Sequence, residues 1–234
     1  MEHVGPELNR KRIVSLAVAA SVILTLFILK SAIYRNPNLE VEEERVASDS
    51  LVLSEFDDLF KEHSDSLLDW KLLAAIASVE SEFDTTKVSP RGAFGLMQVM
   101  PATYRQMLLR IGIADSDSVS NWLNVYAAAQ QLSDMNESFH FINPEERLNY
   151  ILGSYNCGAG HVFDAMRIAR ENGVNRYLWS NVVEIMKTMN GEVEYPDSIC
   201  RCGNFDATET ISYVRKVRRR YREYCEMDTF DIDL

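Results

Sequence analysis

Beyond residue 50, apolar side chains recur at intervals of three and four positions, which is the spacing that lines one face of an α-helix. Strand-like alternation is rare, so we expect an all-α fold, with at most a short hairpin between Met189 and Asn204. The first helix is expected from Leu51, with Val52, Phe56, Leu59 and Phe60 on one side. Further helices are predicted over residues 69–83, 101–111, 143–155, 161–172 and 206–225.

Several of these helices carry recognisable end signals. Asp69 is a suitable N-cap. Pro101 is at the first position of its predicted helix, where the N–H that proline lacks would have no partner within the helix. Residues 143–146, Asn-Pro-Glu-Glu, combine an N-cap, a Pro at the first helical position and a following Glu, and residues 206–209 form a capping box. Gly173 closes the helix before it. These signals support the helix boundaries that the apolar pattern predicts.

An uncharged apolar run occupies residues 13–29 and follows three basic residues, 10–12. As a helix it would span about 26 Å, close to the thickness of a bilayer core. A cleaved signal peptide is the rival interpretation, but Lys30 interrupts the small-residue pattern that a cleavage site needs. We therefore expect a retained anchor, with the chain beyond it outside the cytoplasm by the positive-inside rule.

These patterns predict five parts of the chain. The stretch after the apolar run contains Pro37 and an acidic run from Glu40 to Glu44, with little to bury, which is typical of a tether. The predicted parts are a cytoplasmic N-terminus (1–12), a transmembrane anchor (13–33), an acidic tether (34–50), one helical domain (51–227) and an acidic tail (228–234).

The chain is acidic, with 24 Lys and Arg against 35 Asp and Glu and a formal net charge of -11. A nucleic-acid-binding protein needs a basic face for the phosphates, so no nucleic-acid partner is expected. Any anionic polymer would have to be held by shape, stacking and hydrogen bonds, because the overall charge does not attract it.

The predicted helix over residues 69–83 has a carboxylate on its apolar side. Leu73, Ile76 and Ala77 precede Glu80 by seven, four and three positions, so the four share one face. Burial raises the pKa of a carboxyl, which is the condition for an acid that still holds a proton near neutral pH. The alternative is a Glu at a helix end that a local cap or an Arg neutralises.

A turn-rich loop follows, from Ser89 to Gly95, and then an apolar stretch that contains one amide, Gln98. Glycines let a backbone run close to a ligand, and the Gln98 amide is suited to sugar hydroxyls or an N-acetyl group. A buried amide satisfied by the loop backbone is the other interpretation of Gln98.

Three separated motifs, in order, resemble the signature of the soluble-lytic-transglycosylase (SLT) domain family, which has a goose-lysozyme-like fold. Within that family the likeness is greatest to the catalytic module of the F group of membrane-bound lytic murein transglycosylases, and it covers roughly residues 67–224. The motifs are Glu80-Ser81, residues 92–98 (GAFGLMQ) with Pro101 and Thr103, and Tyr155-Asn156 with Gly158 and Gly160.

The resemblance implies a lysozyme-like helical domain with an active-site cleft, in which Glu80 is the catalytic residue and the cleft needs neither cofactor nor metal. It also implies a helix over residues 124–132, where Ala128 and Gln131 replace the usual Gly and Tyr. The substrate-binding residues that it implies are Ser89, Met97, Gln98, Tyr155, Asn156 and Tyr213.

The activity implied is cleavage of the bond between N-acetylmuramic acid and N-acetylglucosamine in peptidoglycan, with Glu80 as the single general acid and base and a 1,6-anhydro product. A hydrolytic muramidase is the second hypothesis, which requires that Asp84, interpreted as a turn residue, holds a water molecule opposite Glu80. A non-catalytic wall-binding scaffold is the third hypothesis. The expected partners are glycan strands, the bacterial inner membrane through the anchor, and wall-synthesis or remodelling proteins. The domain is expected in the periplasm or cell-wall space.

Four cysteines, at positions 157, 200, 202 and 225, would lie in a compartment where disulfides form. A bond between Cys200 and Cys202 would be strained, so we predict that one of them pairs with Cys225 and pins the loop to the last helix. Cys157 would then be a packed thiol. A Cys-x-Cys metal site has no paired His motif to support it.

Overall fold

The computed structural model describes residues 52–65, 68–113 and 119–230, with side chains as far as 227. The predicted anchor (13–33) and tether (34–50) lie outside the described residues, as does most of the predicted tail. Among the residues that are described, no helix has both the length and the apolar character needed to cross a bilayer.

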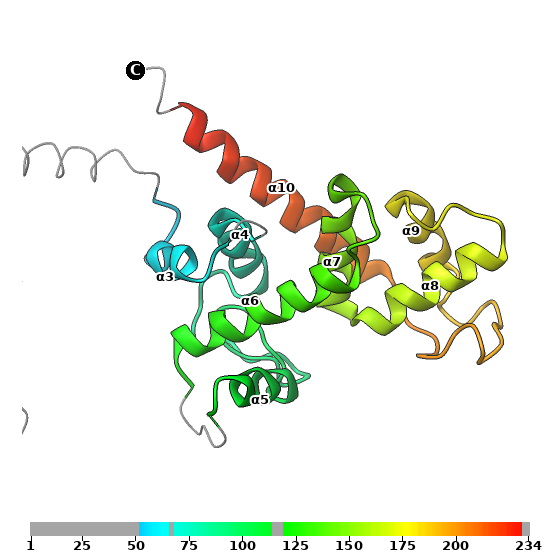
Figure 1. Cartoon of the computed structure of the whole chain (residues 1–234), viewed down its shortest axis with the longest axis horizontal. Coiled ribbons are helices and arrows are strands. Elements are labelled where there is room, and N and C mark those ends of the chain that lie inside the picture. Colours follow the sequence, from blue (N-terminus) through cyan, green and yellow to red (C-terminus); the bar gives the residue numbers. More distant parts are fainter. Residues whose placement is uncertain (1–51, 66–67, 114–118, 231–234) are drawn as a thin grey trace, which may run out of the picture. The chain divides into compact units, whose positions relative to one another are not determined.

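The described part of the chain is helical and contains no strand, which confirms the all-α prediction. Its only β-type pairings are two isolated bridges, Val88 with Phe94 and Phe94 with Val99. The helices, labelled as in Figure 1, are α3 (Asp57–Glu62), α4 (Trp70–Glu80), α5 (Pro101–Arg110), α6 (Asn121–Ser138), α7 (Pro144–Cys157), α8 (Ala159–Glu171), α9 (Trp179–Lys187) and α10 (Thr208–Phe230).

The predicted helix starts are formed by the expected groups. The Asp69 carboxylate accepts from the Lys71 N–H at 3.0 Å and caps α4, and Asn143 accepts from the Glu145 N–H at 3.0 Å and caps α7. Pro101 is the first residue of α5. The helix over residues 124–132 is longer than predicted, because Ser120 caps it by accepting from the Leu123 N–H at 3.1 Å.

Residues 72–77 of helix α4 are all buried. The long helix α10 runs antiparallel to α4 and packs against it more extensively than any other pair of described helices do (Figure 1). The Tyr221 hydroxyl of α10 donates to the Asp69 carboxylate at 3.0 Å, so the residue that caps α4 also holds α10. Two elements more than a hundred residues apart in sequence thereby pack side by side.

Helices α8 and α9 pack together at the side of the domain away from α3 and α5, and α7 packs against both of them and against α10 (Figure 1). The apolar residues of all these helices join one continuous core. Tyr150 of α7 and Phe139, which follows α6, are fully buried in it.

The expected helix start at Leu51 is wrong. Helix α3 begins at Asp57, and Val52 is 74% exposed. The Asp57 carboxylate accepts from the Leu53 N–H at 2.7 Å and the Ser54 N–H at 3.0 Å, which holds the preceding residues in a turn.

The expected hairpin between Met189 and Asn204 is also wrong, because the backbone there bonds to distant groups and not across two strands. The buried Asp164 carboxylate of α8 accepts from the Cys202 N–H at 2.6 Å and pairs with Arg167. Arg167 Nε in turn donates to the Ile199 carbonyl at 2.9 Å. Helix α8 therefore fixes this loop in an irregular shape.

The predicted disulfide is absent, since all four cysteines are described and each is a thiol. Cys202 packs against the start of α8, where a Cβ added to Gly160 would lie 2.4 Å from its sulfur. Cys225 lies near the other end of α10, about 25 Å along the helix from Thr208 by the rise per residue. The loop therefore lies near the wrong end of α10 for a bond to Cys225.

Candidate active site

Glu80 is the last residue of α4, and its side chain lines a cavity of about 630 Å³. The three apolar residues that share its face, Leu73, Ile76 and Ala77, are fully buried, as the helical spacing predicted. Residues of α7, of the loop before α5 and of the start of α10 line the cavity together with Glu80. This volume is typical of sites for small ligands.

The pKa of Glu80 is raised from an ordinary value of 4.5 to about 7, chiefly because burial disfavours its charged form. The nearby Tyr213 hydroxyl and the Lys87 ammonium lower this pKa, and the Glu209 carboxylate raises it. A carboxyl in this environment can both give and take a proton near neutral pH, which is the property that a general acid and base requires.

The loop between α4 and α5 closes one side of the cavity, and a single asparagine of α6 organises it. Asn124 is buried, accepts from the Met97 N–H at 2.9 Å and donates to the Phe94 carbonyl at 3.0 Å. Gly95 has a φ of +77° and passes so close that an added Cβ would lie 2.7 Å from the Asn124 amide. A residue with a side chain could not replace this glycine without moving the loop.

Two side chains join this loop to the helices. Ser81, directly after Glu80, is buried and donates to the Leu96 carbonyl at 2.8 Å. Tyr155 of α7 donates from its hydroxyl to the Met97 carbonyl at 2.7 Å, and burial raises the pKa of that hydroxyl well above 10. Both bonds hold the loop beside Glu80.

Gln98 lines the cavity, but its amide donors are already used, since Nε2 donates to the Lys87 and Gly95 carbonyls at 2.9 Å each. Its backbone is left-handed, with a φ of +47°. The part of Gln98 left to bind a ligand is therefore its carbonyl oxygen, which accepts hydrogen bonds from hydroxyl or amide groups. The interpretation of Gln98 as an amide satisfied by the loop backbone is confirmed for its donors, and its part in ligand binding stays a prediction.

The structure brings Ser89, Tyr155 and Asn156 to the same cavity as Glu80. The Ser89 hydroxyl accepts from the Ala93 N–H at 3.0 Å and shapes the loop. The Asn156 side chain accepts from the Thr210 hydroxyl at 2.8 Å, a bond between α7 and α10. These contacts position the side chains, and their part in substrate binding stays a prediction.

Met97 and Tyr213 do not line the cavity. Met97 is fully buried beneath the loop, and its backbone atoms bond Asn124 and Tyr155. The Tyr213 hydroxyl is buried close to Glu80 and lowers the pKa of that carboxyl. Its influence on a ligand would act through the pKa of Glu80.

The sequence did not assign Glu209 to the site. Within residues 206–209, Asp206 forms the cap by accepting from the Thr208 N–H at 2.8 Å, while Glu209 lines the cavity and raises the pKa of Glu80. Its spacing of four residues from Tyr213 was a usable signal, because positions i and i+4 are neighbours on a helix. Gln131, noted as a departure from the family pattern, also lines the cavity.

Asp84 is an exposed turn residue, as interpreted from the sequence. Its carboxylate accepts from the Thr86 N–H at 2.8 Å and the Thr86 hydroxyl at 2.7 Å, which lowers its pKa. It lies outside the cavity lining. Within the described ranges, no group of three His, Cys, Asp or Glu side chains is arranged to hold a metal ion.

Residues 59–178 match the Transglycosylase SLT domain, and the chain belongs to this family. Among its relatives, membrane-bound lytic murein transglycosylase F of Aeromonas salmonicida is 31% identical over 178 residues, 76% of this chain and 34% of that protein. The protein of the same name from Alcanivorax borkumensis is 34% identical over 168 residues, 71% of this chain and 34% of that protein. The chain spans about a third of the length of these relatives.

A solved structure supports the fold. The 70 kDa soluble lytic transglycosylase of Escherichia coli aligns with a TM-score of 0.52 and 24% identity, over 74% of this chain and 24% of that chain. The domain therefore has the helical fold that the family resemblance implied.

Proposed function

We propose that the protein is a lytic transglycosylase that cleaves the β-1,4 bond between N-acetylmuramic acid and N-acetylglucosamine in peptidoglycan. The observation that carries this proposal is Glu80, a carboxyl with a pKa of about 7 in a cavity of about 630 Å³. Membership of the SLT family supports the choice of substrate and reaction, as does the likeness to relatives that are lytic murein transglycosylases.

Glu80 would act twice in one turnover. Its protonated form donates a proton to the bridging oxygen while the bond from that oxygen to C1 of the muramic sugar breaks. The carboxylate then takes the proton of the muramic 6-hydroxyl, and the 6-oxygen attacks C1. Glu80 returns to its protonated form, the product carries a 1,6-anhydro ring, and no water is consumed.

The surrounding residues support this sequence of steps. The Gln98 carbonyl oxygen is an acceptor for a sugar hydroxyl or an N-acetyl N–H, while its amide stays bound to the loop. Ser81 and Tyr155 hold that loop, so the Gln98 carbonyl oxygen stays in a fixed position relative to the Glu80 carboxyl. We expect Ser89 and Asn156, which line the same cavity as Glu80, to contact the sugars.

Mass spectrometry of the fragments released from purified peptidoglycan tests the reaction. The unmutated protein should release anhydromuramyl ends, and Glu80→Gln should reduce the rate by about 10²- to 10⁴-fold. Glu82→Gln is the matched control, because Glu82 is exposed and lies outside the cavity lining, and it should keep full activity. Full activity of Glu80→Gln would remove Glu80 from the role.

Hydrolysis is the second candidate, and the observation that favours it is the second carboxylate in the cavity, Glu209. A hydrolase needs such a group to activate water, and Asp84 does not reach the cavity. Reducing ends in place of anhydro ends, together with their loss in Glu209→Gln, would establish hydrolysis. Release of neither product would favour a wall-binding scaffold.

We further propose that residues 13–33 anchor the protein in the inner membrane and that the SLT domain faces the periplasm or cell-wall space. The uncharged run, its basic flank and the membrane-bound relatives support this location. Labelling of an engineered surface cysteine by a reagent that cannot cross the membrane, in intact cells, tests it.

A further inference from the structure

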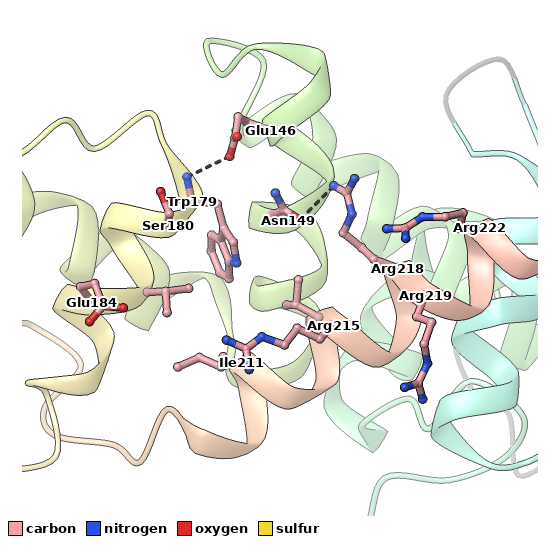
Figure 2. Close-up of a pocket in the computed structure, with 12 residues that line it drawn as sticks. Glu146, Asn149, Trp179, Ser180, Glu184, Ile211, Arg215, Arg218, Arg219 and Arg222 are labelled. Atoms are coloured by element: carbon pink, nitrogen blue, oxygen red, sulfur yellow. Dashed lines mark hydrogen bonds between the residues drawn. The ribbon is translucent and has the colours of Figure 1, made fainter.

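A second cavity, of about 500 Å³, lies between α7, α9 and α10 and shares no lining residue with the cavity around Glu80. Four arginines of α10 line it, at positions 215, 218, 219 and 222, which is the spacing of one helical stripe. Trp179 and Asn149 line the facing walls (Figure 2). We call these six residues and the space they enclose the arginine groove.

The groove has more positive charge than its surroundings neutralise. Arg215 and Arg222 are exposed and have no ion-pair partner among the described residues. Arg218 donates to a neutral acceptor, the Asn149 amide oxygen, at 2.9 Å, and Arg219 pairs only loosely with Glu223 at 3.8 Å. In a chain with a net charge of -11, carboxylates are plentiful, so unpaired arginines in one groove point to an anion from outside.

The two carboxylates that line the groove are already engaged. Glu146 accepts from the Trp179 N–H at 2.9 Å and so caps the start of α9, as the dashed line in Figure 2 shows. Glu184 pairs with Lys187 at 2.7 Å. Neither forms an ion pair with an arginine of α10, and the groove keeps its positive character.

The aromatic wall of the groove is fixed. A Cβ added to Gly153 of α7 would lie 2.6 Å from the Trp179 ring, so this glycine leaves the space that the indole fills. Tyr150 contacts the same ring edge-on at a centroid distance of 5.1 Å. In Figure 2, Arg218 points toward Asn149, whereas Arg219 points the opposite way.

We propose that the arginine groove is an accessory binding site for the carboxylates of peptide stems on the wall polymer. The inference rests on the proposed function, because peptidoglycan supplies those stems. Guanidinium groups bind carboxylates through paired N–H donors, whereas the glycan hydroxyls are neutral. Arg215 and Arg222 are about 10 Å apart along α10, a span that about three extended residues cover. The groove thus fits two carboxylates on one short peptide.

Other anionic partners fit less well. A bilayer presents a broad, flat surface, whereas these arginines line a concavity, and the exposed Glu184 beside them would face the lipid phosphates. A long nucleic acid would be repelled by the net charge of -11. Because the groove and the Glu80 cavity share no lining residue, a bound stem would belong to a part of the polymer that is not being cleaved.

Binding by the full-length Glu80→Gln protein tests the inference, since this background leaves the polymer intact. The probes are purified peptidoglycan, the same material after an amidase has removed its peptides, and phosphatidylglycerol vesicles. Arg215→Gln with Arg222→Gln should weaken binding to peptide-bearing peptidoglycan about tenfold and leave binding to the stripped glycan unchanged. Lys216→Gln with Arg220→Gln, outside the groove lining on the same helix, is the charge-matched control and should change binding less than about twofold.

Equal losses in the two double variants, no loss in the groove variant, or a loss that persists on stripped glycan would each overturn the inference. So would weakened binding to vesicles alone, which would identify a lipid partner. Arg222→Gln alone, which removes one exposed side chain, provides a second variant should the double variant fold poorly. A separate assay measures whether protein with an intact Glu80 releases anhydro ends from the stripped glycan. This glycan has no peptides for the groove to bind, so the assay tests the proposed function alone.

Discussion

The cavity around Glu80 and the arginine groove both lie against α7 and α10, yet their charged groups are in opposite situations. In the cavity a single carboxylate is largely enclosed, and burial moves its pKa to about 7. In the groove, Arg215 and Arg222 stand in solvent without a partner among the described residues. Burial thus shifts the pKa of a carboxyl, which suits it to transfer protons in a reaction. Exposure leaves the charge of an arginine unpaired, which suits it to bind an anion.

The largest effect should come from breaking the loop that encloses the cavity. Gly95→Ala puts a Cβ 2.7 Å from Asn124 at a positive φ, and we expect a loss of roughly 2–4 kcal/mol in the free energy of unfolding, with loss of activity. Gly92→Ala is the control, because its φ is also positive but its Cβ would meet nothing within 4 Å. It should cost about 1–2 kcal/mol in urea unfolding. Equal losses would show that Asn124 does not fix the loop.

A second test measures what enclosing Glu80 costs the fold. Its folded pKa, about 7, exceeds the ordinary value of 4.5, so ionising Glu80 destabilises the folded state progressively as pH rises from about 4.5 to 7. Glu80→Gln should therefore be more stable than the parent by up to about 3 kcal/mol at pH 8, and this difference should vanish below pH 4.5. Denaturant unfolding at both pH values checks this, and a difference independent of pH would contradict it.

The neighbours of Glu80 should move its pH profile in opposite directions. Activity requires protonated Glu80 and should fall as pH rises through about 7. Tyr213→Phe removes a group that lowers the pKa of Glu80, so the fall should move to higher pH, whereas Glu209→Gln removes one that raises it, so the fall should move to lower pH. Rates across pH on one peptidoglycan preparation measure both, and a shift of the same sign in both variants would disprove the assignment.

The smallest effect should be at the groove. Arg222 is exposed and unpaired among the described residues, so Arg222→Gln should change the free energy of unfolding by less than about 0.5 kcal/mol at any pH between 5 and 8. Thermal unfolding with and without salt checks this. A larger loss would mean that the arginines serve the fold, and the contrast with Glu80 would then disappear.

Sequence patterns predicted the elements whose signals are local. The Asp69, Pro101 and Asn143 starts are correct, and so is the placement of Glu80 at the end of a helix whose face is buried. The family motifs grouped Ser89, Gln98, Tyr155 and Asn156, and these residues line one cavity with Glu80. A helix start can be predicted from sequence because the capping side chain and the N–H group that it binds lie within one helical turn.

The features that the sequence did not predict depend on distant partners. The loop over residues 189–204 follows Asp164 and Arg167, which lie far back in the chain, so no local pattern could distinguish it from a hairpin. Helix α9 was missed because its short apolar face, Val182, Val183 and Met186, is defined by contact with α8. The disulfide prediction failed because the loop that holds Cys200 and Cys202 leads into the start of α10, whereas Cys225 lies near the end of that helix.

The packing of α10 on α4 has a consequence for the timing of synthesis. Glu80 leaves the ribosome more than 130 residues before Tyr213, an interval on the order of ten seconds at ordinary translation speed. Until α10 arrives, α4 lacks its most extensive helix contact, and the Tyr213 hydroxyl and Glu209 carboxylate that shift the pKa of Glu80 are not yet in place. The surroundings that set the pKa of Glu80 are therefore complete only when α10 docks.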